Sequence, residues 1–322
     1  MRRLSILVAL VVLAVASAAA QSKKSAVPRT ADGHPDLQGL WDFAQLTPLE
    51  RPGEFAGKEQ ITEEEAEQFA QKRIETTHKD KRDGGAAADV ERAYNDFWWD
   101  FGTRIHKQPS LVVDPPDGRI PAQTKEAQDR IAARRNRYDD IEDRPLAERC
   151  ILGFNSGPPM VPSAYNNNVQ IVQTPGFVVL LLEMNHDARI VAMDGRPHLS
   201  GSLRGWLGDS RGRWEGNTLV IETTNFTPKM ASFSARRGAG GTEYGSGENL
   251  RLVERFTRVD AKTLQYEFTV NDPATFTGPF SGRMPMNWSD EHIYEYACHE
   301  GNYGLQHILR GARAADQRGQ TK

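Results

Sequence analysis

Three short segments of the sequence carry more chemically versatile side chains than a scaffold needs. Residues 183–198 hold two histidines, two arginines and three acids, residues 206–215 hold two tryptophans, two arginines and two acids, and residues 298–303 hold a Cys-His-Glu run. Histidine exchanges protons near neutral pH, arginine binds carboxylates through a two-pronged fork, and tryptophan offers a flat ring. The segments therefore predict a polar small-molecule site with acid–base chemistry.

The expected roles follow from the side-chain types. A histidine is expected to take a proton from a substrate carbon or from water, an acid to orient it, and arginines to hold developing negative charge. The expected catalytic residues are His186, His299, Glu300, Asp194 and Asp209. The expected substrate-binding residues are Arg189, Arg196, His198, Trp206, Arg211, Trp214 and Asn302. This set supports a lyase, isomerase or hydrolase acting on a polar, sugar-derived or carboxylated molecule.

No cofactor is expected, and one divalent metal ion is the alternative. Imidazole and carboxylate groups bind zinc, so the candidate ligands are His186, His198, His299 and Glu300, although their spacing matches no ligand motif. Walker-type, dinucleotide-binding, Gly-x-Ser-x-Gly and His-Glu-x-x-His motifs are absent from the sequence. Two other functions compete with an enzyme: a non-catalytic, lipocalin-like small-molecule binder, and a structural or interaction protein of the cell envelope. The same Asp-Gly-Arg and Asp-Ser-Arg-Gly runs also form good turns in any protein.

The N-terminus has the three parts of a secretory signal. Arg2 and Arg3 precede an apolar run over residues 4–16, and three alanines at 18–20 suit cleavage before Gln21. An uncleaved anchor is the alternative, but the run is short for a span of about 20 residues. We therefore expect a secreted or periplasmic protein with no stable membrane span. The net charge of −3 argues against a nucleic-acid partner, and the oligomeric state stays open.

The two cysteines, Cys150 and Cys298, are expected to form a disulfide in an oxidising compartment, with two buried free thiols as the alternative. The bridge would tie the C-terminal segment to the start of the β region. It would also hold His299 and Glu300 in place.

Periodicity predicts a mainly β fold with a few helices. Thr62 and Glu65 form a capping box that opens a helix over 62–75, and a second helix is expected over 124–138. Short alternating strands separated by turn residues are expected over 169–174, 177–183, 189–193, 218–224, 250–259 and 263–270. This pattern predicts an antiparallel meander closed as a lipocalin-like barrel, with a β-sandwich as the alternative. The opening Gly39-Leu40-Trp41 favours a tryptophan across the base of a barrel.

The chain divides into five expected parts. They are a signal peptide (1–20), a flexible leader (21–35), a helix-containing N-terminal segment packing on the barrel (36–150), an antiparallel β domain (151–313) and a disordered tail (314–322). A last short helix is expected over 304–313, and 237–247 is expected to form a glycine-rich loop. The aromatic run over 94–101 favours a packing plug over a ligand platform.

Several blocks of the sequence resemble one family. They are 39–41, 97–100, 113–121, 148–150, 193–198, 208–216 and 298–303. These blocks are similar to the signature blocks of an uncharacterised family of secreted hypothetical proteins that is abundant in soil bacteria, particularly acidobacteria. The likeness covers nearly the whole mature chain and implies membership but no activity. The Gly-x-Trp opening is also similar to that of lipocalins at the level of the fold.

Overall fold

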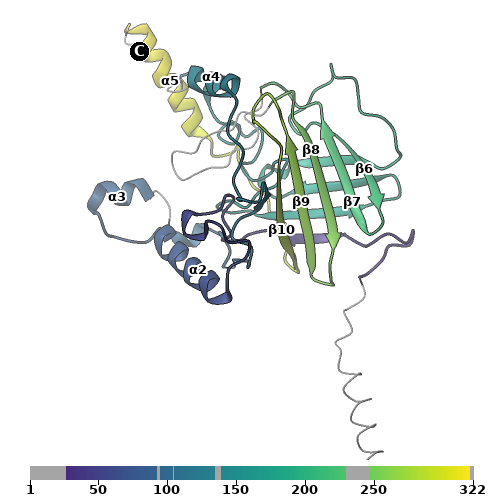
Figure 1. Cartoon of the computed structure of the whole chain (residues 1–322). Helices are drawn as coiled ribbons and strands as arrows, with labels where there is room; N and C mark the ends of the chain where they lie inside the picture. Colours follow the sequence, from purple (N-terminus) through teal and green to yellow (C-terminus); the bar gives the residue numbers. More distant parts are fainter. Residues whose placement is uncertain (1–26, 93–94, 104, 135–138, 230–246, 320–322) are drawn as a thin grey trace, which may run out of the picture.

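A closed β-barrel forms the body of the molecule (Figure 1). The computed structural model describes residues 27–92, 95–103, 105–134, 139–229 and 247–319. Nine strands pair in the order β1-β3-β4-β5-β6-β7-β8-β9-β10, and β10 returns to β1. They are β1 (Gly39–Asp42), β3 (Asn168–Gln173), β4 (Phe177–Leu182), β5 (Ala188–Ala192), β6 (Asp209–Glu215), β7 (Thr218–Thr224), β8 (Arg251–Arg258), β9 (Thr263–Asn271) and β10 (Phe280–Ser289). The predicted barrel is confirmed.

The barrel strands follow the alternation seen in the sequence. In β9, Leu264, Tyr266, Phe268 and Val270 are buried, whereas the residues between them are half-buried. A period of two places every second side chain on the inner face, and the antiparallel register of β8, β9 and β10 stacks these side chains into one core. The apolar pattern therefore sets the register of the barrel wall.

Two of the longer barrel strands, β6 and β10, were not among the predicted strands. β6 overlaps residues 206–215, which were interpreted as part of a polar site. It was not predicted as a strand because its inward positions are Ser210 and Gly212 rather than large apolar residues. β10 was not predicted because Pro285 lies inside it, and proline is uncommon in the interior of a strand. The meander also breaks once, because β5 and β6 pair in parallel, and the connection over 193–208 must therefore cross over outside the sheet.

The base of the barrel is closed by aromatic rings. Trp41 is fully buried, donates from Nε1 to the Leu37 carbonyl (2.8 Å), and packs edge-on against Trp288. The Arg258 guanidinium lies over both rings. Gly39 is required here, since its φ is +123° and a Cβ would lie 2.2 Å from the Trp288 ring. The expected place of the tryptophan is confirmed.

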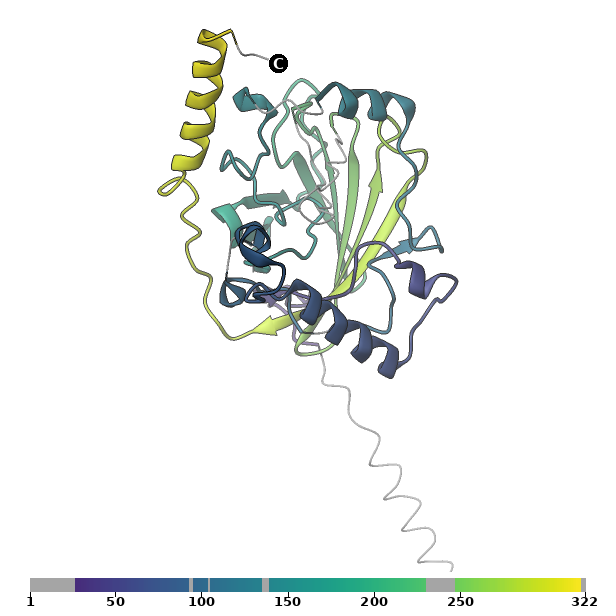
Figure 2. The same ribbon diagram turned by 90° about the vertical axis from the view of Figure 1, so that its left-hand side faces the viewer.

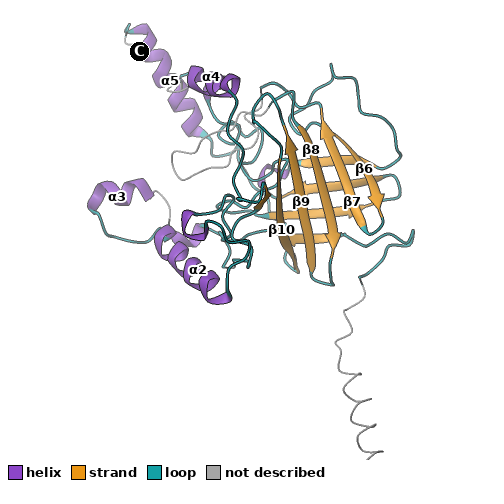
Figure 3. Ribbon diagram, viewed as in Figure 1, coloured by secondary structure: helices purple, strands orange, loops and turns teal. Residues whose placement is uncertain are grey.

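The helices lie on one side of the barrel (Figures 1 and 3). They are α2 (Glu63–Thr77), α3 (Gly85–Arg92), α4 (Lys125–Arg134) and α5 (Tyr303–Gln317), with 3-10 turns η1 (Gly53–Phe55), η2 (Asp96–Trp98), η3 (Ile141–Asp143) and η4 (Met184–His186). The capping box of α2 is present. An extended segment leads from β10 along the outside of the molecule to α5 (Figure 2).

Several boundaries differ from those expected. α3 has no counterpart among the predicted helices, and α5 continues to Gln317, so the tail expected from residue 314 begins in a helix. β1 and the short β2 (Val112–Asp114), both before residue 150, pair with β10. Within the leader, Arg29 bridges to Pro35 and donates to Asn217. The expected signal peptide, residues 135–138 and nearly all of the expected 237–247 loop lie outside the described residues.

The interior of the barrel is filled by side chains and by a plug segment, residues 151–167, that enters one end. Met160 of the plug is fully buried, and its N–H donates to the Tyr266 hydroxyl (3.1 Å). That hydroxyl donates to Glu254 (2.7 Å), which forms a two-bond ion pair with Arg189. We call this end of the barrel the mouth.

Candidate functional site

Four polar residues gather at the mouth, in the turn between β4 and β5. This mouth cluster consists of Glu183, Asn185, His186 and Asp187. Asn185 and His186 both adopt left-handed backbone conformations, with φ of 59° and 54°. Such conformations are uncommon for residues other than glycine and often occur at functional sites. The Leu182 N–H donates to the Asp187 carbonyl (3.0 Å), which closes the turn.

Asp187 is a partly buried carboxyl group with few partners. It accepts a hydrogen bond from the Gly153 N–H (3.2 Å) of the plug segment. Burial raises the pKa of Asp187 to about 6, against the smaller lowering effects of the Gly153 N–H, the Ser156 hydroxyl and His186. A carboxyl group with such a pKa changes protonation state close to neutral pH, as a general acid or base must.

The C-terminal segment after β10 crosses the mouth cluster. We call residues 290–302 the strap. The Tyr294 N–H donates to Glu183 (3.2 Å), and the Tyr296 N–H donates to Nε2 of His186 (3.3 Å). An imidazole nitrogen that accepts carries no proton, so these contacts assign the proton of neutral His186 to Nδ1. The Cys150–Cys298 disulfide, as expected, joins the strap to the start of the plug.

Two amide side chains near the cluster have buried polar atoms without partners. Both Nδ2 and Oδ1 of Asn185 are buried and make no hydrogen bond. Asn155 is fully buried; its Nδ2 donates to the Asn166 carbonyl, while its Oδ1 has no partner. Leaving a buried polar atom unpaired costs about 1–3 kcal/mol, so such atoms usually bond to an ordered water, an ion or a ligand.

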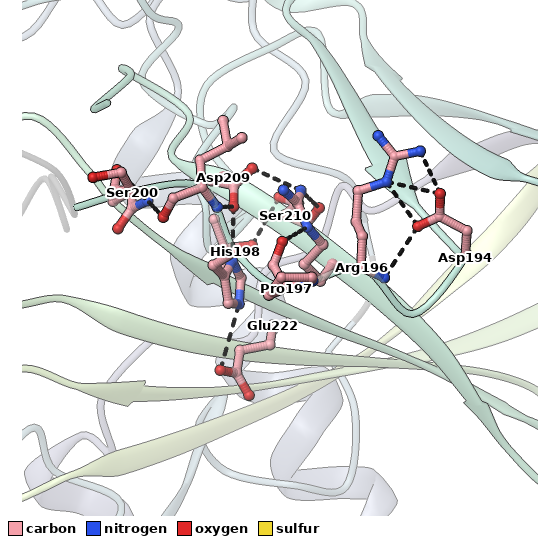
Figure 4. Close-up of polar contacts among 12 residues, drawn as sticks. Asp194, Arg196, Pro197, His198, Ser200, Asp209, Ser210 and Glu222 are labelled. Atoms are coloured by element: carbon pink, nitrogen blue, oxygen red, sulfur yellow. Dashed lines mark hydrogen bonds and ion pairs between the residues drawn. The ribbon is translucent and has the colours of Figure 1, made fainter. Parts of the chain in front are cut away.

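A second polar cluster lies on the outer wall of the barrel (Figure 4). His198 bonds through Nδ1 to Asp209 (2.8 Å), and its Nε2 lies 3.5 Å from Glu222. Asp209 also pairs with Arg211 (2.7 Å), and Glu222 pairs with Arg251 (2.8 Å). The hydrogen bond from Arg251 lowers the pKa of Glu222 below its ordinary value, while burial opposes this effect.

This outer cluster holds the crossover between β5 and β6. Asp209 accepts the Leu199 N–H (3.0 Å), and Arg211 donates to the Pro197 carbonyl (3.0 Å). Asp209 and Arg211 point outward because Ser210 and Gly212 occupy the inward positions of β6. Both ring nitrogens of His198 already face carboxylates, so this arrangement anchors the crossover and leaves neither nitrogen directed at a free partner.

The structure disperses the other residues of the expected site. Asp194 and Arg196 pair with each other at the surface, and Arg189 points into the barrel, 2% exposed. Trp206 packs on the core, and His34 covers one face of Trp214 at 4.6 Å. Asn302 caps α5 and donates to the Glu148 carbonyl. His299 and Glu300 are exposed, and within the described residues their side chains form no hydrogen bond or ion pair.

The four candidate metal ligands do not come together. His198 lies on the outer wall, His186 at the mouth, and His299 and Glu300 at the turn before α5. Among the residues that the structure describes, no group of three or more His, Cys, Asp or Glu side chains is arranged to hold a metal ion.

Sequence reasoning selected His186 but missed its neighbours Glu183, Asn185 and Asp187. A signal was present: an Asn-His-Asp run between two strongly apolar strands demands a tight turn, and asparagine tolerates left-handed conformations. The contacts that the turn makes with the plug and the strap span more than 30 residues in each direction, and no local pattern reports them.

Comparisons with known proteins give no match, so an assignment of function rests on the fold and the site. No protein-family model, curated protein or solved structure matches this chain. None of the helices in the described ranges has the length and apolar character that crossing a membrane requires.

Asp187→Asn is expected to stabilise the protein at neutral pH. The folded-state pKa of Asp187, about 6, exceeds its ordinary value of 3.8. Its contribution to stability is therefore fully present below about pH 4 and is lost as pH rises through about 6. The neutral amide cannot ionise, so the thermal midpoint of Asp187→Asn should rise relative to the wild type between those pH values.

Asp194→Asn is the matched control, because its pKa shift has the opposite sign. The hydrogen bonds from Arg196 lower the pKa of Asp194 to about 2. This contribution is present above about pH 4 and is lost as pH falls towards 2, so Asp194→Asn should not gain stability at neutral pH. Parallel behaviour of the two variants would contradict the burial of Asp187.

Proposed function

We propose that the protein is a secreted or periplasmic enzyme that performs acid–base chemistry at the mouth cluster on a polar small molecule. The observation that carries this proposal is the position of a partly buried Asp187 directly after His186 in a left-handed turn. Asp187 would take a proton from the substrate or from water and return it later in the reaction, and the Nδ1–H of His186 would donate a hydrogen bond to the negative charge that develops. Such a pair suits a lyase, isomerase or hydrolase.

The surroundings support this role. The strap fixes His186 through its backbone, so the ring is oriented without occupying Nδ1. The plug supplies one N–H to Asp187, which leaves accepting capacity on the carboxylate. The unpartnered atoms of Asn185 provide a donor and an acceptor beside the pair. Preorganised polar groups of this kind are what an acid–base site needs.

The alternative of a lipocalin-like binder is less well supported, because Tyr266, Phe256 and Met160 fill the barrel where such a ligand would lie. Secretion is part of the proposal. It rests on the N-terminal signal pattern and on the disulfide, which is typical of oxidising compartments. Membership of the secreted soil-bacterial family remains a proposal that rests on the sequence blocks described above.

A substrate screen tests the proposal. The full chain, exported to a bacterial periplasm, would be incubated in deuterated water with p-nitrophenyl glycosides and esters, neutral oligosaccharides and uronate oligosaccharides. Bond cleavage and deuterium incorporation would be followed by NMR. We expect turnover of one class, a bend near pH 6 in the profile of kcat/KM, and a loss of about 10²–10⁴-fold in Asp187→Asn.

Asp194→Asn is again the control and should retain turnover, since Asp194 is exposed and paired with Arg196. Turnover that survives Asp187→Asn but disappears in Asp209→Asn would show that the reaction occurs at the outer cluster. If no member of the panel is turned over, the enzyme proposal fails.

A further inference from the structure

Aromatic side chains from four distant parts of the chain meet at the mouth. We call this set the aromatic strip: Phe97, Trp98, Trp99, Phe101, Phe154, Tyr165 and Tyr296. Trp99 stacks on Phe101 with ring centroids 5.2 Å apart, and its edge meets Tyr165. Tyr165 in turn contacts Phe154 at 5.4 Å and Tyr296 at 6.2 Å. Trp99, Phe101, Tyr165, Phe154 and Tyr296 therefore form a connected series, which Phe97 and Trp98 directly precede in the sequence.

One end of the strip is open to solvent. Phe97 is 85% exposed and Trp98 is 60% exposed, and their rings contact each other at 5.3 Å. The expectation that this run plugs the core is therefore wrong for both residues. Two large, adjacent aromatic rings left in water are costly, and exposed apolar surface of this kind usually marks a binding surface.

The other end of the strip reaches the mouth cluster. Tyr296 is the strap residue whose N–H bonds to His186, and Phe154 follows Gly153, whose N–H bonds to Asp187. Asn155, next to Phe154, is fully buried with its Oδ1 unpartnered, and its Nδ2 donates to the Tyr165 carbonyl. The strip therefore adjoins the mouth cluster at Tyr296 and at the segment that carries Phe154.

We propose that the aromatic strip is a binding surface for a neutral oligosaccharide, whose sugar rings stack on the aromatic faces and whose hydroxyls bond to the amide and carboxyl groups at the mouth. This inference rests on the proposed function, because it places the oligosaccharide as the substrate that reaches Asp187. Phe97 and Trp98 would hold the sugar units farther from the site of chemistry.

The chemistry of the surface favours this ligand. A pyranose ring has an apolar C–H face and a polar rim, and the strip offers aromatic rings that lead to the polar groups of the mouth cluster. A small aromatic ligand would require an enclosed pocket, whereas the strip is extended and open at Trp98. A membrane surface would require an apolar face without carboxylates.

The charges around the strip favour a neutral chain over a polyuronate. Asp96 and Asp100 lie in the segment that carries Phe97, Trp98 and Trp99, and Glu183 and Asp187 belong to the mouth cluster. Lys79 lies 4.2 Å from the Trp99 ring centroid, where it is occupied by a cation–π contact. A negatively charged polysaccharide would therefore be repelled at both ends of the strip.

Binding of defined probes tests the inference. Cello-, xylo- and chito-hexaose, polygalacturonate, p-nitrophenol and phosphatidylglycerol vesicles would be titrated into the full chain by calorimetry, with tryptophan fluorescence as a second readout. We expect one neutral hexasaccharide to bind and to weaken about tenfold or more in Trp98→Ala and in Phe97→Ala. Tyr303→Ala, which removes a 67% exposed ring on α5, is the matched control and should bind normally.

Failure of this inference and failure of the proposed function give different results. Asp187→Asn should weaken binding of the hexasaccharide, since it alters a carboxyl group at the mouth, whereas Asp194→Asn should bind as the wild type does. Binding of a neutral hexasaccharide to the wild type without turnover would overturn the proposed enzyme and leave the strip as a binding surface. If no neutral hexasaccharide binds, if Trp98→Ala binds as the wild type does, or if only polygalacturonate, p-nitrophenol or vesicles bind, the inference is overturned.

Discussion

Glu254→Ala is expected to lower the free energy of unfolding by about 3–5 kcal/mol, because it leaves the buried Arg189 without its counter-charge. The two side chains are 0% and 1% exposed and form two hydrogen bonds. Attraction to Glu254 raises the pKa of Arg189 although burial works to lower it, and burial raises the pKa of Tyr266 well above its ordinary value. Arg189 does not lose its proton, so the guanidinium without a counter-charge destabilises the folded state.

Urea unfolding followed by circular dichroism measures the loss, and two further variants show where it originates. Arg189→Met/Glu254→Leu removes both charges and should recover most of the stability, since apolar replacements of buried ion pairs are often neutral or better. Glu222→Ala, which breaks the ion pair with Arg251 on the outer wall, should cost only about 0–1 kcal/mol. An effect of Glu254→Ala no larger than that of Glu222→Ala would contradict the buried pair.

Arg189 also shows where sequence reasoning stops. Alternation predicted the strand that carries Arg189 and most other barrel strands, because a period of two can be recognised from neighbouring residues alone. The same alternation directs Arg189 inward, where its partner Glu254 stands 65 residues away. An arginine beside a histidine favours a substrate-binding interpretation until the register of β5 and β8 is known. The alternation in the sequence indicates that Arg189 points inward, but it does not identify Glu254 as its partner.

The mouth cluster was predictable only in part, for a similar reason. His186 stood out by its residue type, whereas Asp187 acquires its perturbed pKa from the plug that buries it. Tyr296 and Trp99 become neighbours of the cluster only after the strap and the N-terminal segment have folded over the mouth. His198, Asp209 and Arg211 were predicted together and are together, but on the outer wall, where Gly212 and Ser210 face inward.

Cys150→Ser/Cys298→Ser is expected to lower the free energy of unfolding by about 2–5 kcal/mol. The bridge closes a loop of 148 residues, for which the chain-entropy model gives about 5 kcal/mol. The loss should be accompanied by a local change, because the bridge anchors the strap. Without it, the strap is held by the Tyr294 and Tyr296 N–H bonds and by the Asn302 contact with Glu148.

Hydrogen exchange distinguishes this local effect from general destabilisation. The amides of Tyr294 and Tyr296 should exchange faster in the double variant under conditions in which the β8–β9 amides remain protected. The ¹⁵N shifts of His186 should report loss of the fixed tautomer, since Nε2 would no longer accept the Tyr296 N–H. Reductant should reproduce both changes in the wild type and alter neither in the double variant. Unchanged exchange at the strap after the bridge is removed would show that the strap holds its place over His186 without the covalent tie.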